Sequence, residues 1–438
     1  MIHGRPSFSR FLCTGRVIAD EEMLGSRRSL LSRAIALVGQ RSAHTVGATA
    51  GAVLEAIKPS DENTSIQVMW KDGVSAKFHR AWLRDNCTCA SCRHPTTLQR
   101  QILTSAIPLH PTGRAALRED KSALSIDWDD VVEGSDCVRS EYSAAWLRDH
   151  AYETPPSGYD SRHCRQQRMD MKTLWSNDLA FPTTTYDAMM ADGFKDGMRQ
   201  LQTWGVLLIK NTPLTMDATE AFARRIGFVM ETIYGGMWTT RPENPEKAYK
   251  DTASTNQALG PHTDCTYLYE PPGLQIFNCV LQAKSTSSSL EGASRFVDGF
   301  HVVEWLRQHA PDTYKFFCDT SLPQYCYDDD VSLHVMRPII QLDAARNVEL
   351  VRFNDFDRSP ITHLSHDQVA AYYKHHKILW DAINNGEVAY KMNEGDMIVV
   401  DNHRVLHGRH AFQGERALVG CYIGRSEYDS RLRVLGLL

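Results

Sequence analysis

Short runs in which apolar and polar residues alternate dominate the segment from residue 65 to residue 150. The runs SIQVMW at 65–70 and LSIDWDD at 124–130 place apolar side chains at nearly every second position, which is typical of β-strands. The pentapeptide AWLRD follows such a strand-like run twice, at 81–85 and at 145–149. We therefore expect a small β-rich domain that contains a local duplication.

The chain from about residue 175 onward combines a long helical pattern with several apolar strands. Apolar residues recur at helical spacing over 183–205, where we expect a helix. Short apolar runs indicate strands at 205–210, 273–281, 347–353 and 396–402. Few of these strands alternate with helices, which favours an antiparallel α+β or sandwich architecture over a doubly wound sheet. No G-x-G-x-x-G or G-x-x-x-x-G-K-[ST] motif occurs, so we do not expect a nucleotide-phosphate site.

The first 60 residues differ from the rest of the chain. Seven arginines and many serines precede the first lysine, Lys58. In the segment 27–41, apolar residues recur every three or four positions, so a helix would gather them on one face. Such an amphipathic, Arg-rich and Ser-rich leader resembles a mitochondrial transit peptide, although the acidic cluster at 20–22 is unusual for one. The alternative for the segment is an unstructured tail, and the alternative location of the protein is the cytoplasm.

These patterns predict three parts of the chain. We expect a leader at 1–60, a small β-rich domain at 61–154 and a larger domain at 170–438. The turn-rich run TPPSGYD at 154–160 is typical of a linker.

Composition and charge exclude several classes of protein. Hydrophobic residues make up 42% of the 438 residues and charged residues 23%, as in an ordinary soluble globular protein. The formal net charge of −5 argues against a general nucleic-acid binder. No apolar run approaches the ~20 residues that span a bilayer, so we expect neither a membrane nor a nucleic-acid partner.

Three of the eleven cysteines lie within six residues, at Cys87, Cys89 and Cys92. Thiolates at this spacing can converge on one ion, and zinc suits a closed tetrahedral site of soft ligands. The fourth ligand is either the neighbouring His94 or the distant Cys137. Binding by Cys137 would join two separate segments, as structural zinc does in small domains. The alternative is a loop with three free thiols.

The strongest indication of chemistry is the run Pro-His-Thr-Asp ending in His262, Thr263 and Asp264. Residues i and i+2 of a strand share one face, so the imidazole and the carboxylate can bind one metal together. A second imidazole follows the predicted strand at 396–402, and we prefer His407 to His403 because the small Gly408 follows it. Two histidines and one carboxylate form the facial triad of non-haem Fe(II) oxygenases, which leaves sites open for a 2-oxo acid and O₂.

Arg416 lies nine residues beyond His407, after the turn-like run FQGE. A guanidinium at this place can bind the distal carboxylate of 2-oxoglutarate through two parallel hydrogen bonds. The combination of the triad and this arginine is more specific than either motif alone.

These residues and the stretches around them resemble the trimethyllysine dioxygenase and γ-butyrobetaine dioxygenase family of carnitine biosynthesis. The resemblance runs from about residue 65 to the C-terminus. It is carried by WLRDNCTCASC, ETIYGGMW, HTDCTYLYEPPGLQIFNC, FVDGF, VRFNDFDR and DNHRVLHGR. ETIYGGMW, the threonine of Cys265-Thr266-Tyr267 and the C-terminal RLRVLGLL are similar to the trimethyllysine branch. The resemblance implies an α+β protein whose double-stranded β-helix (jelly roll) catalytic domain follows a small N-terminal β-rich zinc-binding domain.

The resemblance also implies roles for particular residues. The family's iron ligands correspond to His262, Asp264 and His407, and its co-substrate residues to Arg416 and Ser294. Its aromatic cage for a trimethylammonium group corresponds to Tyr234, Trp238 and Tyr422, and aromatic faces suit this cation because it has no hydrogen to donate. Asn354 and Asp355 match the region that meets the amino-acid end of the substrate. Alignment through the second AWLRD favours Cys137 as the fourth zinc ligand beside Cys87, Cys89 and Cys92.

The implied reaction is hydroxylation of N6,N6,N6-trimethyl-L-lysine at C3, the first step of carnitine biosynthesis. The expected cofactors are Fe(II), 2-oxoglutarate as co-substrate, ascorbate and a structural Zn(II). The first alternative is a γ-butyrobetaine dioxygenase that makes carnitine. Remote alternatives are a zinc-dependent hydrolase and a non-catalytic zinc module. Dimers are common in the family, so the resemblance also implies a homodimer.

Overall fold

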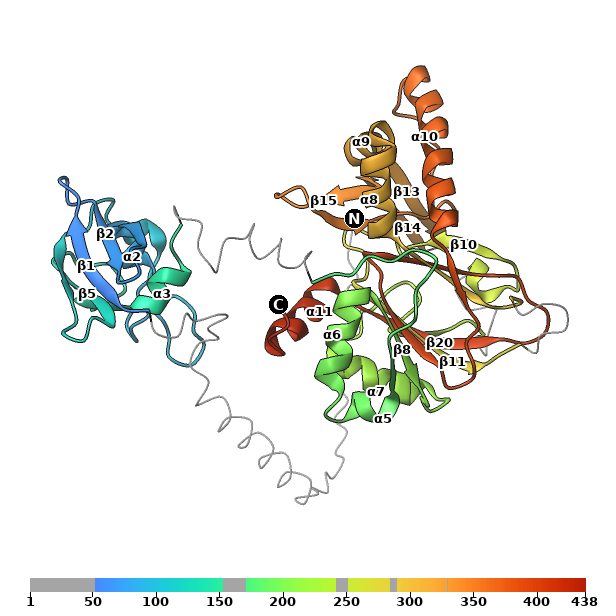
Figure 1. Cartoon of the computed structure of the whole chain (residues 1–438), viewed down its shortest axis with the longest axis horizontal. Helices are drawn as coiled ribbons and strands as arrows, with labels where there is room; N and C mark the ends of the chain where they lie inside the picture. Colours follow the sequence, from blue (N-terminus) through green and yellow to red (C-terminus); the bar gives the residue numbers. More distant parts are fainter. Residues whose placement is uncertain (1–51, 153–170, 242–250, 284–289, 329) are drawn as a thin grey trace, which may run out of the picture. The chain divides into compact units, whose positions relative to one another are not determined.

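The chain folds into two compact units that divide at residue 149. The computed structural model describes residues 52–152, 171–241, 251–283, 290–328 and 330–438 (Figure 1). Most of the predicted leader and the predicted linker at 154–160 lie outside the described residues. The strand β1 (Leu54–Pro59) nevertheless pairs with β2 (Ser65–Trp70). The folded N-terminal unit therefore begins before residue 61, earlier than the sequence predicted.

The N-terminal unit contains the predicted duplication. Each copy is a three-stranded antiparallel sheet followed by a short helix that carries the AWLRD motif. The first copy comprises β1, β2, β3 (Ser75–His79) and α2 (Arg80–Asp85). The second comprises β4 (Gly113–Leu117), β5 (Ala123–Trp128), β6 (Arg139–Ser143) and α3 (Ala144–Asp149), with the short 3₁₀ helix η1 (Thr104–Ala106) between the copies.

The two copies pack against each other reciprocally. Arg148 of the second AWLRD lies over the ring of Trp70 in the first sheet, 5.1 Å from its centroid. Arg84 of the first AWLRD lies over the ring of Trp128 in the second sheet, at 5.8 Å. Each motif thus supplies a cation–π contact to the other copy, and the copies stabilise each other.

The larger unit is built on two antiparallel sheets, apart from one parallel pair. The first sheet has the strand order β7-β8-β18-β11-β20-β9 and the second has the order β10-β19-β12-β17. The strands of the first are β7 (Thr183–Thr185), β8 (Val206–Lys210), β9 (Met237–Thr239), β11 (Leu274–Leu281), β18 (Met397–Asp401) and β20 (Ala417–Ile423). Those of the second are β10 (Leu259–His262), β12 (Ser294–Asp298), β17 (Val388–Tyr390) and β19 (Val405–Arg409). The predicted jelly-roll fold of the larger domain is confirmed.

Apolar side chains from both sheets meet in one buried cluster. The first sheet contributes Leu208 and Val400, and the second contributes Phe296 and Val405. The sheets therefore pack face to face, and polar side chains on the same inner faces form the site described below.

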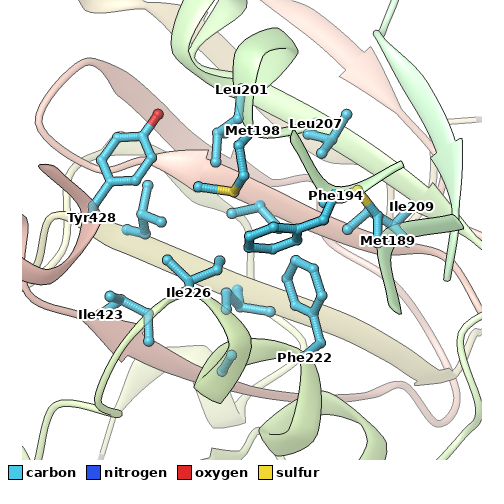
Figure 2. Close-up of a cluster of buried hydrophobic side chains, with 14 of the residues drawn as sticks. Met189, Phe194, Met198, Leu201, Leu207, Ile209, Phe222, Ile226, Ile423 and Tyr428 are labelled. Atoms are coloured by element: carbon cyan, nitrogen blue, oxygen red, sulfur yellow. The ribbon is translucent and has the colours of Figure 1, made fainter. Parts of the chain in front are cut away.

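Four helices cover the outer face of the six-stranded sheet (Figures 1 and 2). They are α5 (Tyr186–Met190), α6 (Phe194–Trp204), α7 (Met216–Ile226) and α11 (Arg425–Val434). Figure 2 shows Phe194, Phe222 and Ile423 converging in the core between them. The prediction of one continuous helix over 183–205 is wrong. The helical path breaks between α5 and α6 because Asp192 and Gly193, which are poor helix formers, favour a turn there.

A second helical layer lies against the outer face of the four-stranded sheet. It comprises α8 (Gly299–His309), α9 (Pro311–Asp319) and α10 (His366–Asn385), which gather beside a hairpin of β13 (Ser321–Asp328) and β14 (Val331–Pro338) (Figure 1). Leu406 of β19 and Val297 of β12 join the core of this layer. The short strands β15 (Ile340–Leu342) and β16 (Val348–Val351) and the 3₁₀ helix η2 (Thr252–Ser254) complete the unit. Within the described residues, no helix has the length and apolar character needed to cross a membrane.

Candidate active site and metal centres

Two strands of the smaller sheet bring the predicted metal ligands together. β10 pairs with β19 so that His262 lies directly opposite His407. The Nε2 atom of His262 lies 3.2 Å from Oδ1 of Asp264, and Nε2 of His407 lies 3.5 Å from the same oxygen. The three ligand atoms lie within 4.8 Å of one another. One ion can therefore contact all three side chains.

Asp264 reaches this site from a turn and not from a strand. β10 ends at His262, and the next backbone amide, that of Thr263, donates to the carbonyl of Phe353 (2.8 Å). Cys265 then adopts a left-handed φ of 54°. The expectation that a strand would align His262 with Asp264 is therefore wrong in its reason, although the two side chains do meet.

The carboxylate of Asp264 is held by groups from the opposite sheet. Gln275 of β11 and Tyr422 of β20 both donate hydrogen bonds to its Oδ2, the latter at 2.7 Å. The side chain of Asn402 accepts from the backbone amide of Asp264 (2.8 Å) and donates to its carbonyl (3.2 Å). These contacts leave Oδ1 directed at the histidines, which is the orientation that a metal ligand needs.

The imidazole of His262 is oriented by its own strand. Its Nδ1 lies 2.8 Å from the carbonyl of Gly260. In the neutral ring this nitrogen carries the proton, so Nε2 remains free to bind a metal. Burial alone would raise the pKa of Asp264, but the neighbouring His407 and His262 hold it well below its usual range. The donor set is thus an ionised carboxylate and two imidazoles, which suits Fe(II) with open coordination positions.

A cavity of about 680 Å³ opens onto the triad. Its walls include every predicted site residue of the larger unit except Asp355. These residues are His262, Asp264, His407, Arg416, Ser294, Tyr234, Trp238, Tyr422 and Asn354. The larger unit therefore concentrates a metal site, a buried cation and an aromatic cluster in one space.

Arg416 and Ser294 meet on the wall of this cavity. Arg416 directly precedes β20, and its Nη2 donates to Oγ of Ser294 at 3.4 Å. The arginine is only 6% exposed. Among the described residues it forms no salt bridge with a carboxylate, and its Nε lacks a hydrogen-bond partner. A buried guanidinium without a counter-ion is costly, so this position fits a carboxylate of a bound molecule.

The aromatic cluster comes from three separate segments. Trp238 of β9 lies 5.8 Å from the ring of Tyr422. Tyr234 lies in the turn before β9, so a turn and a strand present these two aromatic residues. Sequence reasoning missed one aromatic member and one neighbouring carboxylate. Tyr267 lines the cavity beside Tyr234, and Asp251 accepts a hydrogen bond from the Tyr234 hydroxyl at 2.6 Å.

The prediction for Asp355 is wrong. Asp355 does not line the cavity, and its carboxylate accepts a hydrogen bond from His376 of α10 at 2.9 Å. The cavity carboxylate of this segment is Asp357, two residues farther on, while Asn354 lines the cavity as predicted. The run from Asn354 to Asp357 is irregular, so side-chain direction there could not be inferred from strand periodicity.

The cysteine cluster lies in the N-terminal unit. One ligand atom from each of Cys87, Cys89, Cys92 and Cys137 lies within 4.8 Å of the others. The Sγ atoms of Cys87 and Cys137 are 3.7 Å apart. His94 is exposed and not in the cluster, and its Nδ1 accepts hydrogen bonds from the amides of Thr96 and Thr97 instead. The four sulfurs match the donor set of a closed zinc site.

Arg84 provides a positive charge beside these sulfurs. It is fully buried, and it donates to Sγ of Cys92 (3.2 Å) and to the carbonyl of Cys137 (3.1 Å). Its counterpart in the duplicated motif, Arg148, binds the carboxylate of Asp72 in two hydrogen bonds. Burial acts to raise the pKa of Cys92, but hydrogen bonds from Ser135 and Arg84 lower it below the ordinary value. Arg84 thus contacts a sulfur where the equivalent Arg148 contacts a carboxylate. A positive charge at this place would stabilise a metal-bound thiolate of Cys92.

Comparison with known protein families covers both units. Residues 172–422 match the model of the taurine catabolism dioxygenase TauD, TfdA family. Residues 57–148 match the model described as gamma-butyrobetaine hydroxylase-like, N-terminal. The two matches correspond to the jelly-roll unit and to the duplicated N-terminal unit.

Individual relatives match across most of the chain. The mitochondrial trimethyllysine dioxygenase of Rattus norvegicus is 30% identical over 374 residues, which are 82% of this chain and 83% of the relative. That of Gallus gallus is 31% identical over 374 residues, covering 82% and 84%. The gamma-butyrobetaine dioxygenase of Pseudomonas sp. (strain AK-1) is 30% identical over 380 residues, covering 85% and 94%.

Proposed function

Because the chain belongs to the TauD, TfdA family of dioxygenases, and within it to the trimethyllysine and γ-butyrobetaine dioxygenases, we propose that it hydroxylates N6,N6,N6-trimethyllysine at C3. The reaction would be the first step of carnitine biosynthesis and would depend on Fe(II) and 2-oxoglutarate. The observation that carries the proposal is the meeting of a His-Asp-His triad, a buried arginine and an aromatic cluster in one cavity.

His262, Asp264 and His407 would hold the iron. When bound, Fe(II) with 2-oxoglutarate activates O₂ for hydroxylation of an unactivated C–H bond. The protein's own contribution is orientation. Gln275 and Tyr422 fix the carboxylate of Asp264 by hydrogen bonds, and Gly260 fixes the ring of His262. Such contacts around a metal site commonly change metal affinity or activity by about 10–100-fold.

Tyr234, Trp238, Tyr267 and Tyr422 would bind the trimethylammonium end of the substrate. A quaternary ammonium group has no hydrogen to donate, so it is recognised by the negative faces of aromatic rings. Asp251 adds a carboxylate beside this cluster through its contact with Tyr234. Binding at this end places the alkyl chain toward the iron ligands and excludes water from it.

Turnover of a substrate panel tests the proposal. With Fe(II), 2-oxoglutarate and ascorbate, we expect release of CO₂ from 2-oxoglutarate that depends on trimethyllysine, and a product heavier by one oxygen. The kcat/KM for trimethyllysine should exceed that for γ-butyrobetaine. A preference for γ-butyrobetaine would favour the alternative, a γ-butyrobetaine dioxygenase. Consumption of a substrate without O₂, with no hydroxylated product and no release of CO₂, would indicate a zinc-dependent hydrolase.

Arg416 would bind the distal carboxylate of 2-oxoglutarate with help from Ser294. We expect Arg416→Met to raise the KM for 2-oxoglutarate by roughly 100-fold, because a charge-assisted pair of hydrogen bonds in a buried site is lost. Arg416→Lys should recover only part of this affinity, since lysine lacks the planar fork. The measurement is the initial rate of trimethyllysine hydroxylation against 2-oxoglutarate concentration. An unchanged KM in Arg416→Met would contradict the assignment.

Four further features complete the proposal. Cys87, Cys89, Cys92 and Cys137 would bind a structural Zn(II) in an N-terminal domain that precedes the catalytic domain at 170–438. Ascorbate would maintain the iron in its ferrous state. Animal relatives are named mitochondrial, which supports a mitochondrial location and a role for the Arg-rich leader as a transit peptide. A homodimer is proposed by analogy with the family.

A further inference from the structure

Two carboxylates line the cavity in addition to the metal ligand, namely Asp251 and Asp357. They are held by different groups. Asp251 accepts from the hydroxyl of Tyr234 and so belongs to the aromatic end. Asp357 accepts hydrogen bonds from Nδ2 of Asn354 (2.8 Å) and from Oγ1 of Thr266 (3.1 Å). The cavity therefore holds carboxyl groups at two separately built positions.

Asp357 has no cationic partner within the part of the chain that the structure describes. No lysine or arginine there forms a salt bridge with it, and its side chain accepts hydrogen bonds only from the neutral side chains of Thr266 and Asn354. Burial raises the pKa of Asp357 to about 7, and the nearby His262 opposes this only in part. A desolvated carboxylate without a counter-ion is costly. Its presence in a cavity wall indicates a place for a positively charged group of a ligand.

The arginines of the cavity are engaged elsewhere. Arg409 directs its guanidinium at backbone carbonyls of the segment 252–257, among them those of Ala253 (2.6 Å) and Thr252 (3.0 Å), and its charge interacts with that of Asp251. Arg416 lies beside Ser294 at the co-substrate position. Neither arginine is therefore the counter-ion of Asp357, and its carboxylate can pair with a cationic group of the substrate.

We propose that Asp357 binds the α-ammonium group of the substrate and selects an amino acid over a betaine that lacks this group. This inference rests on the proposed function. Trimethyllysine carries two cationic groups, and the cavity holds two carboxylates besides the metal ligand. The quaternary group fits the aromatic end with Asp251, while the α-ammonium has three N–H donors to offer to Asp357.

Asn354 acts here as a positioning residue. Its Oδ1 accepts from the backbone amide of Phe356 (3.0 Å), which fixes the amide group, and its Nδ2 then donates to Oδ2 of Asp357. One carboxylate oxygen of Asp357 is thereby anchored by Asn354 and Thr266. The other carboxylate oxygen, Oδ1, remains available for the α-ammonium group of the substrate.

The test compares trimethyllysine with the same molecule lacking only its α-amino group, 6-(trimethylammonio)hexanoate. Wild-type enzyme should have the higher kcat/KM for trimethyllysine. Asp357→Asn, which keeps the shape and removes the charge, should lower this kcat/KM by roughly 100-fold and leave that for the analogue unchanged. The matched control is Asp355→Asn, since this neighbouring carboxylate contacts His376 and does not line the cavity. It should alter neither value.

The outcomes separate this inference from the proposed function. Equal losses for both substrates in Asp357→Asn, or no loss for trimethyllysine, would overturn the role of Asp357 while the proposed function stands. Wild-type enzyme that prefers the analogue would also overturn it, and this measurement does not require the variant to fold. Wild-type enzyme that hydroxylates no trimethylammonium compound would overturn both.

Discussion

Replacement of His262 by alanine is expected to reduce trimethyllysine-dependent CO₂ release by roughly 1000-fold or more. The imidazole is one of the three proposed metal ligands, and its Nε2 lies 3.2 Å from the carboxylate that would share the ion. With two ligands left, the site should lose both its iron and the geometry that the reaction needs. The measurements are the turnover rate and the iron content after dialysis against a fixed concentration of Fe(II).

The control for this prediction is His309→Ala. His309 is an exposed histidine at the end of α8, where its ring stacks on Trp305. This variant should keep the turnover and iron content of the wild type. If His262→Ala retained more than about a tenth of the activity, the assignment of the triad as the iron site would fail.

Replacement of Cys137 by serine is expected to release zinc and unfold the N-terminal unit. Structural zinc sites contribute about 10–16 kcal/mol of apparent binding free energy in small peptides, so loss of one thiolate ligand should remove several kcal/mol of stability. As the proposed fourth ligand, Cys137 would also join the second copy of the duplication to the loop after the first. Zinc content by mass spectrometry and thermal unfolding of the full chain provide the measurements.

His94→Ala separates the two candidates for the fourth ligand. Because His94 is exposed and lies outside the sulfur cluster, this variant should retain one zinc per chain and the wild-type unfolding temperature. Zinc loss in His94→Ala together with zinc retention in Cys137→Ser would reverse the assignment.

The success of the sequence predictions depended on how local each feature was. The facial triad was predicted because His262 and Asp264 are two residues apart and His407 follows a clearly apolar strand. The duplication was predicted because the pentapeptide AWLRD occurs twice in the sequence. In each case the signal lies in short runs of sequence, although these runs are far apart along the chain.

The failures arose where backbone direction departs from regular structure. Asp355 and Asp357 are two residues apart, yet one contacts His376 and the other lines the cavity. Asp251 belongs to the aromatic end only because its loop lies beside Tyr234. No spacing rule predicts such contacts, since they depend on irregular segments.

The amino-acid sequence by itself indicated the class of chemistry, an antiparallel α+β or sandwich architecture and the His262, Asp264 and His407 triad. These follow from residue type and short-range periodicity, which act through nearest neighbours and regular hydrogen bonding. Only the tertiary structure decided that Cys137 completes the sulfur cluster, that Asp264 arrives from a turn, and that Asp357 faces the cavity. These depend on contacts between segments distant in sequence, whose geometry emerges only when the sheets and loops have packed.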